Sequence, residues 1–330
     1  MTIVFHRANR VGDNVVAIRA IYAIKSLFPQ AKLIVASNAI GVNLYANLTF
    51  IDVLLNLESN PNALDTIQRI DYFILTHRTS ANIAFAKNTT ARKIIVKAHL
   101  HSLFSSRFIN DYSFFTKTRP ESENLMSLVR LIDKRAFDNG AKNLNFSVAR
   151  LQTTEENKGF VKDFCAQNQC FYDASRTNIG INFFGSGGVC FFSLEVWYEI
   201  IRDLAYTFSD CNFIILSPPL HSLESFDMPN IAVFINNADL LNLVAITECL
   251  NALISVDTGN VHIADNLGIP TLGIYTPKMA KRWRGGTYGG KFVQFVMSSN
   301  DKECNTLQKE RFLDFAKGQI PTLLQNLNYQ

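Results

Sequence analysis

The stretch SVDTGNVHIADNLGIPTLGIYTP, residues 255–277, decides the fold class of this chain. An apolar run ends at the Asp-Thr-Gly of residues 257–259, a helical pattern that carries His262 follows, and a second apolar run ends at a Thr-Pro pair. In open α/β sheets, the carboxyl ends of strands and the amino ends of helices form crevices in which backbone amides bind ligands. The stretch therefore predicts a strand–helix–strand unit with a ligand site at residues 257–262.

Similar units recur along both halves of the chain. The apolar runs lack polar alternation, which is typical of parallel strands that are covered on both faces, and alternating strands and helices predict a doubly wound α/β sheet. The predicted strands are 2–5, 32–37, 52–57, 72–76, 93–96, 178–184, 212–217, 231–236, 252–256 and 271–275. The predicted helices are 13–28, 42–47, 62–69, 81–87, 121–137, 155–167, 194–208, 240–248, 260–267 and 307–327, and residues 100–120 are expected to form a loop.

The length of 330 residues favours two domains over one hydrophobic core. The polar segment 139–154 interrupts the pattern of strands and helices, so we place the boundary there. We expect an N-terminal domain over residues 1–150 and a C-terminal domain over 151–330, both Rossmann-like with doubly wound parallel sheets. A cleft between the two domains would let one ligand contact both, and the last helix is expected to pack back across them.

Composition and charge exclude several classes of protein. A net charge of +4 and a pI of about 8.7 argue against a nucleic-acid partner but fit an anionic ligand or an anionic membrane face. No apolar run approaches the roughly 18 residues of a membrane span, and the N-terminus lacks a secretory pattern, so we expect a cytoplasmic protein. The six cysteines show no metal-ligand spacing, and His99 and His101 lack a carboxylate or cysteine nearby, so we expect no metal.

The first candidate site is RANRVGD, residues 7–13, which follows the first predicted strand and opens the first helix. Asp13 could simply cap that helix, a contribution of about 1 kcal/mol. The same carboxylate at the carboxyl end of a strand could instead act as a base, because a helix amino end stabilises its ionised form. The loop by itself leaves both interpretations open.

The second candidate is FFGSGGVC, residues 183–190, in which Gly185, Ser186 and Gly187 lie between a predicted strand and a predicted helix. Small residues in this position expose backbone amides that suit a phosphate group. The spacing is neither GxGxxG nor that of a P-loop, so a plain tight turn explains the segment equally well.

The third candidate is the opening stretch itself, with Asp257, Thr258, Gly259 and His262. The amides of residues 258–260 could hold a diphosphate, and His262 could donate to one of its oxygens. A lone histidine on a helix is more often a structural residue than a ligand contact. Because His262 lies near three polar residues at a strand end, the structural and the functional interpretation are equally open. Lys278 belongs to a group of cations after residue 275 that could be solvated or could contact an anionic acceptor.

Taken together, these segments resemble the heptosyltransferases of glycosyltransferase family 9. The opening pattern of that family, Arg-x-x-x-Leu-Gly-Asp before a helix that ends in Phe-Pro, corresponds to RANRVGD, with Val11 in place of Leu, and to the Phe-Pro of residues 28–29. Its later pattern, Asp-Ser/Thr-Gly-x-x-His-x-Ala-x-x-Leu-Gly-x-Pro, corresponds to DTGNVHIADNLGIP, residues 257–270. The resemblance covers nearly the whole chain in the same order.

The resemblance implies a GT-B fold, with the acceptor held mainly by the N-terminal domain and the nucleotide-sugar donor by the C-terminal one. It implies an inverting transfer of heptose from ADP-heptose, without a catalytic metal or other cofactor, to the inner core of lipopolysaccharide. The acceptor would be a lipid-linked oligosaccharide of the Kdo-lipid A type, which implies peripheral contact with the inner membrane. By position, Asp13 matches the catalytic base of the family, and the residues matching its donor contacts are Asp257, Thr258, Gly259 and His262.

One departure from the family concerns the donor phosphates. Family members carry a Lys several residues before a Trp, but alignment on Trp197 offers only Cys190, Phe191 and Phe192, and no Lys or Arg lies between residues 176 and 202. Another cation would have to replace it, and the candidates for phosphate or acceptor contact are Arg10, Gly12 and Lys278, with Glu224 as a weakly aligned ribose contact.

Three alternatives therefore stay open. The chain could transfer heptose to protein side chains, it could be a non-catalytic nucleotide-sugar-binding protein of the same fold, or it could be a sugar-nucleotide epimerase. An epimerase usually needs several carboxylates in its cleft, whereas only Asp13 and Asp257 are well placed here. A dehydrogenase is disfavoured because the dinucleotide fingerprint is missing.

Overall fold

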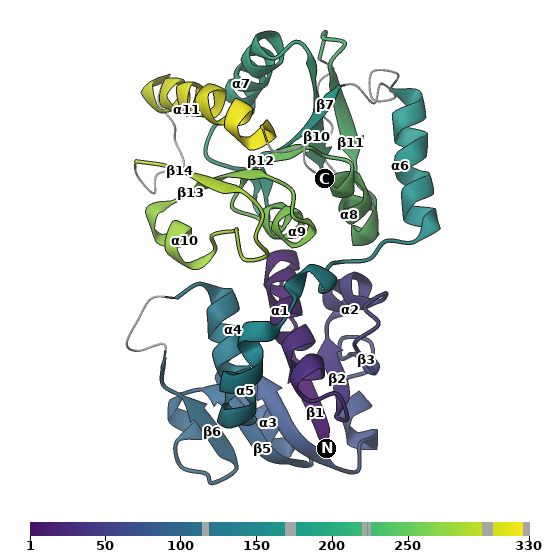
Figure 1. Cartoon of the computed structure of the whole chain (residues 1–330), viewed down its shortest axis with the longest axis vertical. Helices are drawn as coiled ribbons and strands as arrows, with labels where there is room; N and C mark the ends of the chain where they lie inside the picture. Colours follow the sequence, from purple (N-terminus) through teal and green to yellow (C-terminus); the bar gives the residue numbers. More distant parts are fainter. Residues whose placement is uncertain (114–118, 169–175, 220–222, 224–225, 299–305, 326–330) are drawn as a thin grey trace. The chain divides into compact units, whose positions relative to one another are not determined.

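A computed structural model describes residues 1–113, 119–168, 176–219, 223, 226–298 and 306–325. The chain folds into two compact units, Met1–Leu151 and Gln152–Gln330, which we call unit 1 and unit 2 (Figure 1). Their division lies one residue from the boundary expected from the sequence. Each unit contains its own parallel six-stranded sheet with helices between the strands, as expected for the GT-B fold class.

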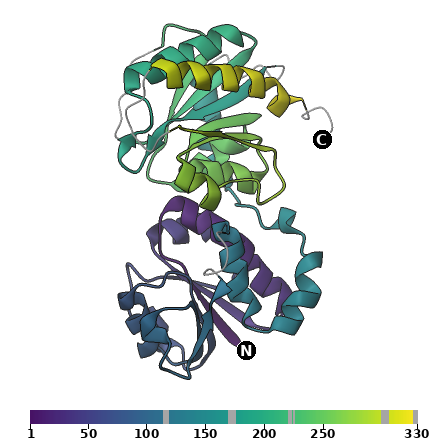
Figure 2. The same ribbon diagram turned by 90° about the vertical axis from the view of Figure 1, so that its left-hand side faces the viewer.

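The sheet of unit 1 has the strand order β3-β2-β1-β4-β5-β6, and all its neighbouring strands are parallel. Its strands are β1 (Thr2–His6), β2 (Lys32–Ser37), β3 (Val53–Asn56), β4 (Ile70–Leu75), β5 (Ala91–Lys97) and β6 (Phe108–Asp111). Its α-helices are α1 (Val11–Leu27), α2 (Ala39–Tyr45), α3 (Ser80–Asn88), α4 (Glu121–Arg130) and α5 (Lys134–Gly140). Figure 2 shows helices along both faces of this sheet, which explains why its central strands are largely apolar.

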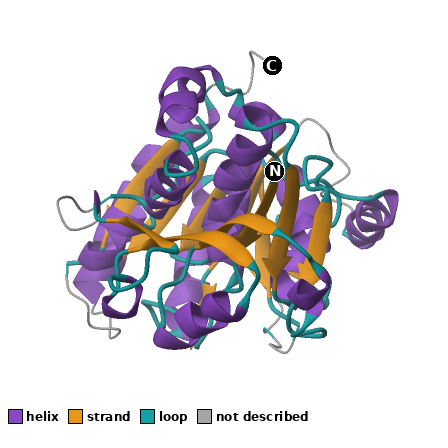
Figure 3. Ribbon diagram, turned by 90° about the horizontal axis from the view of Figure 1, so that it is seen from below, coloured by secondary structure: helices purple, strands orange, loops and turns teal. Residues whose placement is uncertain are grey.

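The sheet of unit 2 has the order β11-β10-β7-β12-β13-β14, again with parallel neighbours. Its strands are β7 (Thr177–Asn182), β10 (Cys211–Ser217), β11 (Ile231–Ile235), β12 (Ala252–Val256), β13 (Thr271–Tyr275) and β14 (Phe292–Val296). Its helices are α6 (Glu155–Gln167), α7 (Leu194–Thr207), α8 (Leu240–Glu248), α9 (Gly259–Leu267), α10 (Pro277–Arg282) and α11 (Thr306–Leu324). Figure 3 shows strands flanked by helices throughout the chain.

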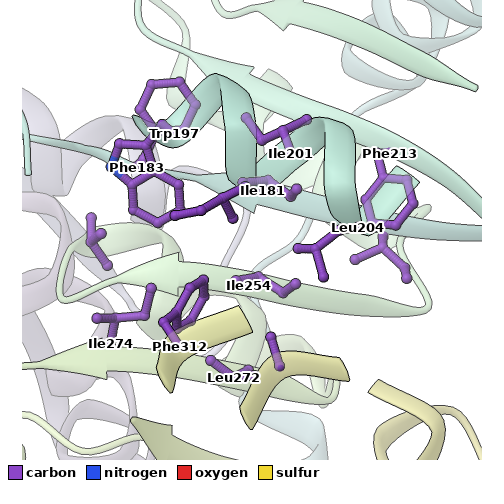
Figure 4. Packing of buried hydrophobic residues seen from close by; sticks show 14 of the residues in the cluster. Ile181, Phe183, Trp197, Ile201, Leu204, Phe213, Ile254, Leu272, Ile274 and Phe312 are labelled. Atoms are coloured by element: carbon purple, nitrogen blue, oxygen red, sulfur yellow. The ribbon is translucent and has the colours of Figure 1, made fainter. Parts of the chain in front are cut away.

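Helices α7 and α11 cover one face of the unit 2 sheet. Trp197 of α7 stacks on Phe183 with ring centroids 5.3 Å apart, and Phe312 of α11 lies 6.0 Å from the same indole (Figure 4). All three side chains are fully buried. At about 25 cal/mol per Å² of buried apolar surface, aromatic side chains of this size dominate the stability of such a core. The buried residues of α11 are therefore part of the core of unit 2. The sheet of this unit carries the glycine-rich segment of residues 183–190.

The structure corrects several predicted elements, mainly at the sheet edges. The 100–120 loop contains β6, and Lys278, Lys281 and Arg282 belong to α10, which precedes a further strand, β14. The helix predicted over 121–137 is two helices, because the Asp133 side chain accepts a hydrogen bond from the amide of Ala136 and begins a new helix. The helix predicted over 62–69 is only a 3-10 turn at Ala63–Thr66, and that over 42–47 begins at Ala39, capped by Asn38.

Candidate functional site

The first group of candidate residues lies where the strand order of unit 1 reverses. β1 is followed in the chain by β2 and β3 on one side, and the chain then returns to place β4 on the other side of β1. The connection from β1 to α1 therefore leaves the sheet at its topological switch point, where open α/β sheets bind ligands. RANRVGD occupies this connection, so the structure places Arg10, Gly12 and Asp13 there together.

Buried polar side chains fix this connection. Asn14 is fully buried and donates to the carbonyl oxygens of Asn9 (2.9 Å) and Arg10 (3.1 Å). Asn38 donates to the same Asn9 oxygen at 3.0 Å, and the hydroxyl of Ser37 donates to the carbonyl of Arg7. Because side chains from α1, β2 and the start of α2 bind the loop backbone, the loop presents Asp13 in one defined position.

The carboxylate of Asp13 does not cap α1. The N-cap residue is Arg10, and Asp13 is the third residue of the helix. Its Oδ1 accepts a hydrogen bond from Nη2 of Arg7 at 2.6 Å, while Nε of Arg7 donates to its carbonyl oxygen at 3.1 Å. The Asp13 side chain is 21% exposed and that of Arg7 only 2%. The carboxylate is thus held by a buried cation and still reaches solvent, which is the arrangement that a base for an incoming hydroxyl needs.

Behind Arg7 lies a second pair of buried charges that the sequence analysis missed. Glu121, the first residue of α4, places Oε1 3.6 Å from Nη1 of Arg7 and Oε2 3.4 Å from Nζ of Lys97 at the end of β5. Charges of alternating sign therefore run from Asp13 through Arg7 and Glu121 to Lys97. We call these four side chains the charge row. His6 adds no charge beside it at neutral pH, because burial and then the Arg7 guanidinium lower the pKa of His6 to about 4.

The second group of candidate residues lies at the switch point of unit 2, between β7 and β12. Asn182, the last residue of β7, is 3% exposed, and its Nδ2 lies within hydrogen-bond distance of the hydroxyl oxygens of Ser255 (3.1 Å) and Thr258 (3.0 Å). This side chain ties the ends of two central strands to the start of α9. The only sequence signal for the role of Asn182 was that it is a polar residue at the end of the largely apolar segment NIGIN. The sequence analysis did not use that signal.

The amino end of α9 presents backbone amides without a side-chain cap. Thr258 is the N-cap residue, but its hydroxyl is engaged by Asn182, and the structure shows no side-chain hydrogen bond that caps this helix. The first amides of a helix have no partner within it, and together they carry about half a positive charge. The turn at Thr258, Gly259 and Asn260 is therefore suited to bind an anion.

Asp257 directly precedes this turn, and its carboxyl has a raised pKa. Burial raises the pKa of the Asp257 carboxyl from 3.8 to about 7. A substantial share of the molecules therefore carries a neutral carboxyl here at neutral pH. A neutral carboxyl can donate a hydrogen bond to a phosphate oxygen, whereas an ionised carboxylate would repel it.

The glycine-rich segment forms a tight turn, one of the two interpretations left open by the sequence. β8 (Phe184–Gly185) and β9 (Gly188–Val189) pair as an antiparallel hairpin, with Ser186 and Gly187 exposed at its tip. The hairpin lies beside the α9 turn, since a Cβ on Gly185 would be 3.9 Å from Cγ2 of Thr258. The same Cβ would lie 2.6 Å from Sγ of Cys190, so glycine allows this close packing.

The remaining candidates occupy different surroundings. His262 is 5% exposed on α9, and its ring lies 5.9 Å from that of Trp283. Lys278 is exposed near the start of α10, which follows β13 at the same edge of the sheet as Thr258. Glu224 lies outside the described residues.

The loop of residues 286–288 in unit 2 depends on Asp265 of α9, another residue that the sequence analysis missed. Asp265 is 3% exposed, and its carboxylate accepts hydrogen bonds from the amides of Gly286 (2.9 Å), Thr287 (3.0 Å) and Tyr288 (3.3 Å). The hydroxyl of Thr287 adds a fourth donor at 2.6 Å. One buried carboxylate thereby fixes the segment that follows Trp283, the neighbour of His262.

Within the ranges that the structure describes, no group of three His, Cys, Asp or Glu side chains could hold a metal ion, and the rings of His99 and His101 lie 5.3 Å apart. None of the described helices is both long enough and apolar enough to cross a bilayer.

Comparisons with known proteins agree with this architecture. Residues 224–313 match the model of glycosyltransferase family 9 (heptosyltransferase). A Haemophilus influenzae protein named "Putative glycosyltransferase" is 21% identical, over 97% of this chain and 96% of its own length.

Solved structures give the same fold. A glycosyl transferase family 9 protein from Veillonella parvula has a TM-score of 0.73 and 16% identity, covering 98% of this chain and 97% of its own. The E. coli ADP-heptose lps heptosyltransferase II has a TM-score of 0.67 and 16% identity, with 99% and 100% coverage. An E. coli heptosyltransferase solved with ADP has a TM-score of 0.66 and 14% identity, with 98% and 100% coverage. The fold predicted from the sequence, two Rossmann-like parallel-sheet domains of the GT-B class, is confirmed.

Proposed function

We propose that this chain, a glycosyltransferase whose residues 224–313 match family 9, moves a heptose from ADP-heptose to the inner core of lipopolysaccharide or lipooligosaccharide. The observation that carries the proposal is the uncapped amino end of α9 at the switch point of unit 2, inside the matched segment. Its amides suit the diphosphate of a nucleotide sugar and replace the divalent cation that other glycosyltransferases use.

Unit 2 is assigned the donor. The diphosphate would accept hydrogen bonds from the amides at Thr258, Gly259 and Asn260, and the neutral carboxyl of Asp257 would avoid repelling it. The hairpin tip at Ser186 and Gly187 and the ring of His262 would provide further contacts. No Lys or Arg occurs between residues 176 and 202, so Lys278, at the same edge of the sheet, is the cation that we assign to the phosphates.

Unit 1 is assigned the acceptor. The carboxylate of Asp13 would take the proton of the attacking hydroxyl as its oxygen bonds to the anomeric carbon on the face opposite the phosphate. The bond from that carbon to the diphosphate oxygen breaks, ADP leaves with the electron pair, and the anomeric configuration inverts. General-base assistance of this kind contributes on the order of 10²–10⁴-fold. The hydrogen bonds from Arg7 would hold the carboxylate in place during this step.

The acceptor and location that we propose are a lipid-linked oligosaccharide of the Kdo-lipid A type at the cytoplasmic face of the inner membrane. Support comes from the likeness in fold to a lps heptosyltransferase and from the net charge of +4, which favours an anionic surface. No resident cofactor is required, since the nucleotide sugar is consumed as a substrate.

A donor screen tests this function. The chain is incubated with Kdo-lipid A type acceptor and ADP-heptose, or with other nucleotide sugars, and products are read by mass spectrometry. The proposal expects one added heptose, only from ADP-heptose. Heptose found on a protein substrate instead would indicate a protein O-heptosyltransferase. Donor binding by calorimetry without any product would indicate a non-catalytic nucleotide-sugar-binding protein.

A further inference from the structure

The segment between Tyr72 and Asn110 of unit 1 has a one-sided charge. It contains six Lys and Arg residues and three His residues but no Asp or Glu, although the whole chain has 28 acidic residues against 32 basic ones. Lys97 is buried against Glu121, which leaves five Lys or Arg side chains outside the charge row. Arg92, Lys93 and Arg107 lie at the amino ends of β5 and β6, whereas Arg78 and the histidines follow the carboxyl ends of β4 and β5 and give that edge of the sheet a positive charge that attracts anionic surfaces.

Within this segment, one turn presents apolar side chains to solvent. Leu100 is 65% exposed, Leu103 is 46% exposed and Phe104 is 86% exposed. We call these three side chains the apolar turn. They follow β5 at the 3-10 helix Leu100–Ser102, on the side of the molecule where β1 and β4 also end. Tyr112, which follows β6, is 55% exposed as well.

The apolar turn has a fixed backbone. Ser102 is fully buried, and its hydroxyl donates to the carbonyl of His99 at 2.7 Å, while Nδ2 of Asn110 donates to the carbonyl of Ser102 at 3.2 Å. Nη1 of Arg78 donates to the carbonyl of Ala98 at 2.8 Å, which brings a cation to the base of the turn. A buried hydroxyl and two neighbouring side chains thus support a backbone whose apolar side chains face outward.

We propose that the apolar turn inserts into the headgroup region of an anionic bilayer, with Arg78 at its base contacting a lipid phosphate. Interfacial binding of this kind combines buried apolar side chains with electrostatic attraction to anionic lipids, and the segment offers both. A phenylalanine exposed over 86% of its surface fits this occupant, because an aromatic ring placed at the headgroup level leaves water without needing a protein partner. The inference deepens the proposed function, whose acceptor is lipid-linked.

Vesicle binding tests the inference without donor or acceptor. The chain is sedimented with vesicles of phosphatidylcholine alone and with vesicles that contain phosphatidylglycerol. Binding is expected only to the anionic vesicles and should weaken when NaCl rises from about 50 mM to about 300 mM, because salt screens the attraction. The double variant Leu103→Ser/Phe104→Ser should bind the anionic vesicles at least tenfold more weakly. Since the assay uses no sugar, its failure would leave the donor screen unaffected.

The matched control is Tyr206→Ser in unit 2, which removes an aromatic ring that is 81% exposed. This variant should bind vesicles like the unaltered chain, and circular dichroism should show both variants folded. Equal binding to neutral and anionic vesicles, or unchanged binding by the double variant, would overturn the proposal. So would light scattering that shows the double variant turning a dimer into a monomer with unchanged vesicle binding, because the turn would then be a subunit interface.

Discussion

Replacing Asp257 with Asn should stabilise unit 2, and by an amount that grows with pH. The carboxyl of Asp257 is partly buried just after β12, and burial raises its pKa from 3.8 to about 7. In the unfolded chain the same group loses its proton near pH 3.8. Between these two values the folded state binds a proton that the unfolded state has released, so the free energy of unfolding falls as pH rises. Asn has a similar shape and never ionises.

The size of the effect follows from the two pKa values. The rise from 3.8 to about 7 is slightly more than 3 pKa units. Each unit corresponds to about 1.4 kcal/mol, so the ionised carboxylate destabilises the folded state by about 4 kcal/mol above pH 7. The difference in unfolding free energy between Asp257→Asn and the unaltered chain should therefore be near zero at about pH 4 and approach 4 kcal/mol at about pH 8.

Tryptophan fluorescence during urea unfolding is the natural assay. Both tryptophans of the chain, Trp197 and Trp283, belong to unit 2, so the signal reports the unfolding of that unit. Asp163→Asn on α6 is the matched control for the loss of a carboxyl from unit 2, because Asp163 is exposed. A constant difference between Asp257→Asn and the unaltered chain from pH 4 to pH 8 would refute the assignment of a partly buried carboxyl that is partly neutral at pH 7.

Two further predictions concern the residues that the sequence analysis missed. Glu121→Gln removes the acid that pairs with both Arg7 and Lys97, so Arg7 should hold the Asp13 carboxylate less firmly and the single-turnover rate of transfer should fall about tenfold while ADP binding is unchanged. An unaltered rate would contradict the charge row as the support of Asp13. Asp265→Asn should lower the unfolding free energy of unit 2 by about 2–4 kcal/mol, because an amide cannot accept all the hydrogen bonds that residues 286–288 donate to the carboxylate. Urea unfolding measures this loss, and a loss below about 0.5 kcal/mol would contradict the role of Asp265 in holding that loop.

The apolar central strands could be predicted from the sequence because a strand that is buried on both faces has a continuous run of hydrophobic residues. β1, β7, β12 and β13 were all located in this way, whereas the strand order that creates the switch points came only from the structure. The edge strands β6 and β14 were missed because FIND and FVQFV carry polar or partly exposed residues that weaken the pattern, whereas the other two edge strands, β3 and β11, keep apolar runs and were located.

The candidate sites were only partly predictable, and the reason is distance along the chain. Asp13 and the turn at residues 257–259 lie in contiguous motifs that a sequence displays directly. Arg7, Glu121 and Lys97 come from three separate elements that only the folded sheet brings together. Asn182 likewise meets Thr258 from 76 residues away, and no local pattern records such a contact.

The most direct test of the central claim is the rate of heptose transfer by Asp13→Asn, measured in single-turnover experiments with ADP-heptose and the Kdo-lipid A type acceptor. Asp65→Asn, an exposed residue of unit 1, is the control, and ADP binding followed by calorimetry shows that the donor site is intact. The account predicts that Asp13→Asn binds ADP normally and transfers heptose on the order of 10²–10⁴-fold more slowly, while Asp65→Asn retains full activity. A folded Asp13→Asn variant that transfers heptose at the unaltered rate would contradict it.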